Sequence, residues 1–134
     1  MTEETAAAAC SRPRFRPMTE ADLAAVLELE AGCHPDPWTA DMLRTSLNQG
    51  HRCRVMELDG ALRGHAVLQV AAGDAELLDL CIAEAYRGQG WGRVFLRHLV
   101  AEAREAGAAT LFLEGRVSNE AAIALYTGEG FQQG

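Results

Sequence analysis

The sequence predicts a single α/β domain in which a mixed β-sheet is flanked by helices. Three observations predict this fold class. The chain has 134 residues, a length typical of one domain that buries its own core. The pair Asp59-Gly60 separates two apolar runs, which is a hairpin signal and predicts antiparallel strands. Strand-like and helix-like segments then alternate, as expected of strand–helix–strand units with parallel pairing.

The N-terminal segment is expected to lie outside this domain. Residues 1–12 read as a disordered, alanine-rich tail, and the domain is expected to fill residues 13–134. The segment carries Glu3 and Glu4 and lacks a basic start, so it makes a poor signal peptide. Because the sequence holds no apolar stretch long enough to cross a bilayer, we expect no membrane association and a cytoplasmic compartment.

Two helices are predicted between a short strand at residues 15–18 and a stop at Gly50. The first helix follows Thr19 and Asp22, whose spacing resembles a capping box, and prolines at positions 35 and 37 break it. The second helix begins after Thr39 and ends before Gly50. Their apolar positions are Leu23, Val26 and Leu27 in the first and Met42, Leu43 and Leu47 in the second. The acidic residues expected to fall mostly off the apolar face of the first helix are Glu20, Glu28 and Glu30.

The remaining elements form the predicted sheet and its crossover helix. Strands are expected at residues 53–58, 61–70 and 76–83, and the near-continuous apolar run of the third predicts burial on both faces. A helix follows, and Gly107 ends it. Its apolar positions are Phe95, Leu96, Leu99, Val100 and Ala103. A strand is expected at residues 110–114, and a last helix starts at residue 118 or 119.

Charge and cysteine content restrict the classes of function. A formal net charge of −7 argues against a protein that grips nucleic acid, because phosphate binding needs a basic face. The negative charge is compatible with a basic protein substrate. Equally, it could serve only to keep the protein soluble. The four cysteines form no CxxC pair and no zinc-finger spacing with histidine. We therefore expect reduced core cysteines and no metal.

The most informative motif is a glycine-rich turn that opens the crossover helix, Arg87-Gly88-Gln89-Gly90-Trp91-Gly92. Helix N-termini present unpaired N–H groups and a partial positive charge, and glycines let phosphates approach the backbone. The turn reads as a diphosphate cradle with added charge from Arg87 or Arg93. Neither the dinucleotide fingerprint nor the P-loop fits, because position 93 is arginine and no Gly-Lys-Ser/Thr follows. Taken alone, the pattern leaves a purely structural turn as an equal alternative.

The surrounding residues resemble a known family. Arg-x-x-Gly-x-Gly after the strand Leu78-Asp79-Leu80-Cys81-Ile82 is similar to the acetyl-CoA loop of the GNAT superfamily of N-acetyltransferases. Residues 113–126, LEGRVSNEAAIALY, resemble the second signature of the bacterial ribosomal-protein-alanine acetyltransferases, and Gly130-Phe131 closes it as in that family. Residues 37–39 and 48–50 also resemble family segments. The resemblance runs in register over residues 14–131.

The resemblance implies a fold, a reaction and a co-substrate. The fold is the acyl-CoA N-acyltransferase fold, and acetyl-CoA is the acetyl donor. The implied reaction is direct attack on the thioester by an amine, with the N-terminal alanine of a ribosomal protein as first candidate. Two alternatives remain: a GNAT enzyme acting on a lysine side chain or small-molecule amine, and a non-catalytic acyl-CoA-binding module. The oligomeric state is left open.

The resemblance also assigns roles to individual residues. Glu114 matches the general base and Tyr126 the general acid, although a solvated carboxylate and a half-buried core tyrosine are the simpler alternatives. The implied cofactor-binding residues are Leu80, Cys81, Ile82, Arg87, Gly88, Gln89, Gly90, Trp91, Gly92, Arg93 and Asn119, of which Asn119 could equally be a helix cap.

Two residue types are given no chemical role. Cys81 is expected to contribute backbone groups and not a nucleophile, since no histidine lies near it in sequence to activate the thiol. The histidines are interpreted as surface or packing residues: His34, His51, His65 and His98.

The resemblance further implies a C-terminus shorter than in the family. Members continue past the Gly-Phe pair for some 25 to 30 residues that form two more strands, whereas this sequence stops at Gly134. We therefore expect the sheet to lack its last two strands and to leave an unpaired edge. Activity and substrate binding are expected to suffer more than the cofactor site, whose parts are all present.

Overall fold

The predicted hairpin forms and organises the antiparallel half of the sheet. In the computed structural model, which describes residues 12–113, Asp59 and Gly60 have φ values of 54° and 80°, the left-handed pair that a tight hairpin turn needs. They join β2 (Arg52–Leu58) to β3 (Ala61–Ala71). A second left-handed turn at Ala72-Gly73 leads from β3 into β4 (Asp74–Ile82).

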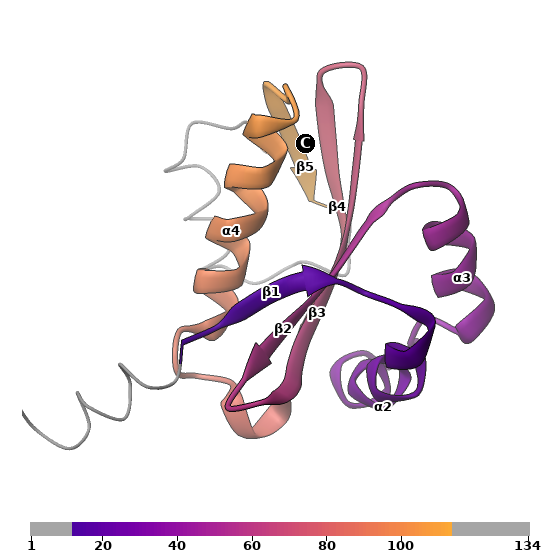
Figure 1. Ribbon diagram of the computed structural model, residues 1–134, viewed down its shortest axis with the longest axis vertical. Helices are drawn as coiled ribbons and strands as arrows, with labels where there is room; N and C mark the ends of the chain where they lie inside the picture. Colours follow the sequence, from indigo (N-terminus) through magenta and orange to yellow (C-terminus); the bar gives the residue numbers. More distant parts are fainter. Residues whose placement is uncertain (1–11, 114–134) are drawn as a thin grey trace, which may run out of the picture.

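Within residues 12–113 the sheet has five strands in the order β1-β2-β3-β4-β5 (Figure 1). The short strand β1 (Arg14–Pro17) pairs antiparallel with β2, whereas β5 (Thr110–Leu113) pairs parallel with β4. The parallel connection runs through the 3₁₀ turn η2 (Glu84–Tyr86) and the helix α4 (Trp91–Glu105). The mixed sheet expected from the sequence is thus confirmed for the described residues.

Both N-terminal helices begin at the predicted caps. The Asp22 carboxylate accepts hydrogen bonds from Thr19 N–H at 2.8 Å and from the Thr19 hydroxyl at 3.1 Å, which starts η1 (Glu20–Asp22) and α2 (Leu23–Cys33). The Thr39 hydroxyl accepts from Met42 N–H at 3.2 Å at the start of α3 (Ala40–Asn48). The segment between α2 and α3, residues 34–39, contains the two predicted helix-breaking prolines.

The core is split by the sheet into two layers. Helix α4 covers one face, and α2 and α3 cover the other (Figure 1). The layer between the sheet and α4 includes Met56, Leu68, Leu77, Phe95, Leu99 and Leu111. The layer between the sheet and the helices α2 and α3 includes Leu23, Val26, Leu43, Val55 and Val67. Burial of β4 on both faces, expected from its apolar run, is confirmed by this division.

A β-bulge in β4 decides which side chains face which layer. Val67 pairs with Asp79 and Leu68 with Leu77, so Leu78 has no partner in β3. Such an extra residue reverses the inside–outside alternation of a strand. Leu78 and the next residue, Asp79, therefore both face the α2 layer, whereas Leu77 packs in the α4 layer.

Several expectations fall outside the described residues. All but the last residue of the expected tail (residues 1–12), the last helix and the Gly130-Phe131 pair lie within residues 1–11 and 114–134, for which no structure is described. None of the helices within residues 12–113 combines the length and the apolar character that a membrane span requires.

Candidate active site

The glycine-rich turn has the backbone form of an anion cradle. Gly88 and Gly90 have φ values of 75° and 91°, which only glycine adopts readily. Gly90 is the N-cap of α4, and the first helical hydrogen bond runs from Val94 N–H to the Gly90 carbonyl at 3.1 Å. The amides of residues 91–93 therefore precede the helical ladder and present donors at the positive end of a 15-residue helix. This geometry fits a diphosphate.

The end of β4 lies directly beside this turn. A methyl group added at Gly92 would meet the Ile82 side chain at 3.8 Å, so the first turn of α4 sits against the last residue of the strand. The β4–β5 pairs run from Asp74–Thr110 to Leu77–Leu113. On the β5 side, the backbone of Leu80, Cys81 and Ile82 has no strand partner within residues 12–113. An extended arm such as pantetheine can pair with backbone groups of this kind.

Two of the predicted cofactor residues make intramolecular contacts in this structure. Arg87 donates from Nε to the Ile82 carbonyl and from Nη2 to the Gly32 carbonyl, each at 2.9 Å. Arg87 Nη2 also lies 3.2 Å from Cys33 Sγ. Gln89 Nε2 donates to the Ala85 carbonyl at 3.1 Å. Arg87 thus joins the end of β4 to the end of α2, and contact of either side chain with a diphosphate stays a prediction.

Some of the remaining predicted site residues lie at the start of α4, and the others lie outside the residues that the structure describes. Trp91 is partly buried and Arg93 is exposed at the start of α4. Glu114, Asn119 and Tyr126 lie outside the described residues, so their roles stay predictions. The structure therefore brings together the cofactor half of the predicted site, Leu80–Ile82 with Gly88–Arg93.

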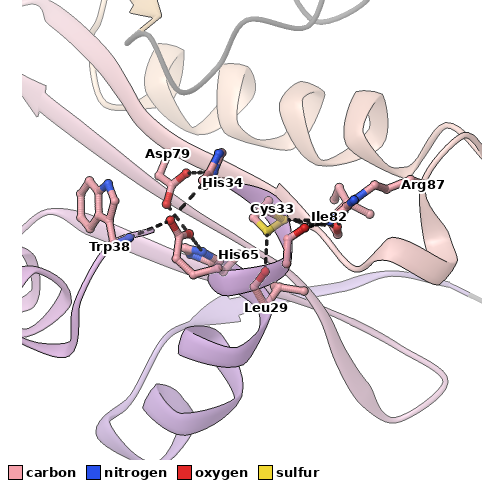
Figure 2. Close-up of a disulfide and its surroundings, with 11 residues drawn as sticks. Leu29, Cys33, His34, Trp38, His65, Asp79, Ile82 and Arg87 are labelled. Carbon is pink, nitrogen blue, oxygen red and sulfur yellow. Dashed lines mark hydrogen bonds and ion pairs between the residues drawn. A yellow bond between two sulfur atoms is a disulfide. The ribbon is translucent and has the colours of Figure 1, made fainter. Parts of the chain in front are cut away.

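A buried polar cluster on the α2 face of the sheet was not anticipated. It consists of Glu30 on α2, His34 at its C-cap, His65 on β3 and Asp79 on β4, and Figure 2 labels the last three of these residues. His65 Nε2 lies 2.6 Å from Glu30 Oε2, and His34 Nε2 lies 2.9 Å from Asp79 Oδ1. Glu30, His65 and Asp79 are at most 1% exposed. The histidines expected to be surface or packing residues thus include two members of a hydrogen-bonded polar cluster.

Glu30 is the centre of this cluster, and its position differs from the one predicted for it on the helix. It was expected mostly off the apolar face of its helix, yet it is fully buried because the sheet supplies partners for its carboxylate. Its Oε1 accepts the backbone N–H of Trp38 at 3.1 Å, which ties the 34–39 segment to α2. Burial acts to raise the pKa of Glu30, but the hydrogen bonds with His65 and with the Trp38 backbone N–H oppose burial, and the pKa is lowered from its ordinary value. The carboxylate is therefore ionised inside the protein.

The cysteine prediction was wrong for two of the four residues. Cys33, at the end of α2, and Cys81, on β4, form a disulfide across 48 residues of sequence (Figure 2). Their Cα atoms are 6.0 Å apart, an ordinary separation for a disulfide. Cys53 is a free, buried thiol as expected, and burial raises its pKa to about 11. Cys10 lies outside the described residues.

The environment of Cys81 also differs from the sequence-based picture. His65 is its cross-strand partner on β3, and possible ligand atoms of Glu30, His65 and Cys81 all lie within 4.8 Å of one another. A histidine remote in sequence is therefore close in space. The one sequence signal for this cluster was Asp79, a lone acid inside an apolar strand, which demands a partner when buried.

A shallow groove lies beside the 34–39 segment. It has a volume of about 330 Å³ and is lined by Trp38, Asp41, Met42, Thr45 and Ser46. Met42 is 40% exposed, so the groove offers apolar contact with a carboxylate in its lining. Such a surface can receive the first residues of a peptide and its ammonium group.

Comparison with known proteins agrees with this arrangement. Residues 23–131 match the sequence model of the Acetyltransferase (GNAT) family. The chain is 39% identical over 114 residues to the [ribosomal protein bS18]-alanine N-acetyltransferase of Escherichia coli strain K12, covering 84% of this chain and 76% of that one. It is 36% identical over 126 residues to a putative enzyme of the same name from Bacillus subtilis, covering 92% and 83%.

Solved structures show the same fold. The crystal structure of the ribosomal-protein-S18-alanine N-acetyltransferase from Escherichia coli superposes with a TM-score of 0.78 at 32% identity, covering 90% of this chain and 78% of that one. The NatC complex bound to Gag peptide and CoA superposes with a TM-score of 0.72 at 20% identity, covering 90% and 85%, a likeness of fold alone.

Proposed function

This chain belongs to the acetyltransferase (GNAT) family, and from that premise we propose that it transfers the acetyl group of acetyl-CoA to the N-terminal alanine of ribosomal protein bS18. The observation that carries the proposal is the pairing of the Gly88–Gly90 cradle with the open backbone edge of Leu80–Ile82. The relatives at 36–39% identity that bear this activity in their names support the acceptor.

The cofactor half of the site would act through backbone groups. The amides of residues 91–93 would bind the diphosphate of acetyl-CoA at the N-terminus of α4, with Arg93 adding positive charge and Asn119 a further contact. The backbone of Leu80, Cys81 and Ile82 would pair with the pantetheine arm. One of these amides would also donate to the oxyanion that forms when the thioester carbonyl is attacked.

The acceptor half would use side chains that follow β5 in sequence and the groove beside Trp38. Glu114 would take a proton from the acceptor ammonium, whose pKa is near 8, directly or through water. Tyr126 would give a proton to the departing thiolate. The groove with Asp41 in its lining would hold the peptide's first residues. The net charge of −7 would speed encounter with a basic protein.

The direct test is acetylation of defined peptides. The protein is incubated with acetyl-CoA and a peptide carrying the bS18 N-terminus, with a free N-terminal alanine and an internal lysine, and products are mapped by liquid chromatography–mass spectrometry. We expect acetyl only on the α-amine and no product from a matched peptide with a blocked N-terminus. Acetyl on the lysine would show a different acceptor. Binding of acetyl-CoA without any product would show a non-catalytic module.

A further inference from the structure

The disulfide lies where the proposed reaction would release a thiol. Cys81 is the central residue of the Leu80–Ile82 segment that is proposed to bind the pantetheine arm, and that arm ends in the sulfur that carries the acetyl group. After acetyl transfer this sulfur becomes the free thiol of coenzyme A. Cys33 and Cys81 are bonded at this point, so a thiol product and a protein disulfide would meet in one site.

From this juxtaposition we infer that Cys33–Cys81 is a thiol-exchange site for coenzyme A. The inference rests on the proposed function for the position of the coenzyme. The coenzyme A thiolate attacks Cys33 Sγ, a new sulfur–sulfur bond forms between them, and the Cys33–Cys81 bond breaks. Cys81 departs with the electron pair as a thiolate and takes up one proton. No external oxidant or reductant is consumed, since one disulfide replaces another.

Accessibility selects Cys33 as the sulfur that is attacked. Cys33 is partly exposed at the end of α2, whereas Cys81 is 2% exposed. The Arg87 guanidinium lies 3.2 Å from Cys33 Sγ and can attract an approaching thiolate, because opposite charges concentrate the nucleophile at this sulfur. A thiol entering from the surface therefore reaches Cys33 first.

The surroundings of Cys81 suit a departing thiolate. An imidazole nitrogen of His65 lies within 4.8 Å of Cys81 Sγ, and His65 Nε2 is hydrogen-bonded to the ionised Glu30 at 2.6 Å. His65 Nδ1 is buried without a hydrogen-bond partner among the described residues. A carboxylate–imidazole pair next to a sulfur favours its thiolate form, and a better leaving thiolate accelerates exchange.

The fold can also accept the opened bond. The Leu29 carbonyl lies 3.3 Å from Cys81 Sγ, and the Ile82 carbonyl lies 3.5 Å from Cys33 Sγ. The Leu29 carbonyl can accept the Cys81 S–H once the disulfide is exchanged, and the Ile82 carbonyl can accept a Cys33 S–H only if the pair is fully reduced, so a protonated Cys81 would not be left buried without a partner. Because the fold can hold Cys33 and Cys81 both with the disulfide formed and with it opened, the two cysteines are suited to reversible exchange.

The experiment follows the covalent product directly. The full chain, purified without reductant, is incubated with coenzyme A and analysed by intact mass under non-reducing conditions. We expect a gain of one coenzyme A molecule, located on Cys33 by peptide mapping, with Cys81 newly open to alkylation. Acetyl-CoA, whose thiol is blocked, should give no adduct. Glutathione at the same concentration should react at least about tenfold more slowly, because it lacks the binding that raises the local concentration of coenzyme A.

Variants separate the steps. Gly90→Val should reduce the coenzyme A rate to that of glutathione, His65→Asn should slow exchange with both thiols, and Cys53→Ser should leave the adduct unchanged. The inference is overturned if Cys33 and Cys81 both alkylate freely at the start, if the adduct sits on Cys53, or if coenzyme A reacts no faster than glutathione. Calorimetric titration with acetyl-CoA is run in parallel. Normal acetyl-CoA binding and peptide acetylation without an adduct refute the exchange alone, whereas absent binding refutes the proposed function.

Discussion

The carboxylate of Glu30 lies 2.6 Å from the imidazole of His65, and both side chains are buried between α2 and the sheet. The same carboxylate accepts the Trp38 backbone N–H. One acidic residue therefore joins a helix, a central strand and the segment that borders the candidate acceptor groove. Removing one member of such a buried cluster leaves the remaining polar groups in the interior without a hydrogen-bond partner, which destabilises the folded state.

Replacing Glu30 by alanine should destabilise the protein by about 3 kcal/mol, because His65 and the Trp38 N–H lose their acceptor in the interior. Urea unfolding followed by circular dichroism measures the change. The matched control is Glu28→Ala on the exposed side of the same helix, which should change the free energy of unfolding by less than about 0.5 kcal/mol. Equal effects of the two substitutions would show that the buried pair is not stabilising.

The Arg16–Asp22 ion pair should make stability depend on pH at the acidic end. The Arg16 hydrogen bonds, opposed by burial, lower the pKa of Asp22 to about 2 from its ordinary value of 3.8. A folded-state pKa below the unfolded one means that the stabilisation is complete above pH 3.8 and is lost as pH falls toward 2.

The measurement is the difference in free energy of unfolding between the wild type and Asp22→Asn, taken at several pH values. After solvent screening we expect about 1 kcal/mol at pH 7, shrinking between pH 4 and pH 2. An Arg16→Gln background should remove most of this difference at every pH. A difference that stays constant down to pH 2 would contradict the assignment.

Gly90→Val should abolish acetyl-CoA binding in calorimetric titration. Valine is strained at the φ of 91° found there and would block the approach of a phosphate to the amides at the start of α4. Gly107→Val is the control, since Gly107 has a φ of 94° beyond the other end of α4. That variant should lose stability but keep acetyl-CoA affinity. Unchanged affinity in a folded Gly90→Val protein would remove the cradle from the site.

Glu114→Gln should retain acetyl-CoA binding and lose about 10²- to 10⁴-fold in peptide acetylation, the usual range for removal of a general base. Steady-state rates with the alanine-starting peptide provide the comparison. The exposed Glu105, replaced by glutamine in the same way, should have wild-type rates. Wild-type turnover in Glu114→Gln at neutral pH would require another base.

Reducing the disulfide should lower the free energy of unfolding by about 2–4 kcal/mol, since the bond closes a long loop and restricts the unfolded chain. Urea unfolding with and without a reductant tests this. The double variant Cys33→Ser/Cys81→Ser should be insensitive to reductant, and Cys53→Ser should respond as the wild type does. Stability that does not change on reduction would show that the bond adds no constraint.

The topology could be predicted from the sequence because its signals are local. Asp59-Gly60 defines the hairpin, Thr19 and Thr39 define the helix starts, and the glycines of the α4 turn define the candidate cradle. Each signal acts over a few residues, where backbone conformation and capping are decided. The resemblance to the GNAT superfamily then suggested acetyl-CoA as the co-substrate for this turn.

The polar cluster and the disulfide could not be predicted in the same way. Glu30, His65 and Asp79 come from three elements, and Cys33 lies 48 residues from Cys81. The apolar run of β4 gave no alternation from which a face could be assigned to Asp79 or Cys81. The bulge at Leu78 determines the face of the sheet to which the Asp79 and Cys81 side chains point. That bulge depends on the pairing of β4 with β3 and not on any local sequence pattern.

The unpaired residue Leu78 in β4 determines on which face of the sheet the later side chains of this strand lie. If Leu78 paired with Val67 and the strand continued without the bulge, Asp79 would pair with Ala66 and every later side chain would change sides. Asp79 and Cys81 would then lie in the apolar layer under α4. Leu80 and Ile82 would lie on the face that holds His34 and His65. Deletion of Leu78 would instead leave Leu77 and Asp79 consecutive and still paired with Leu68 and Val67, so the bulge could be lost without moving Asp79 or Cys81 to the other face.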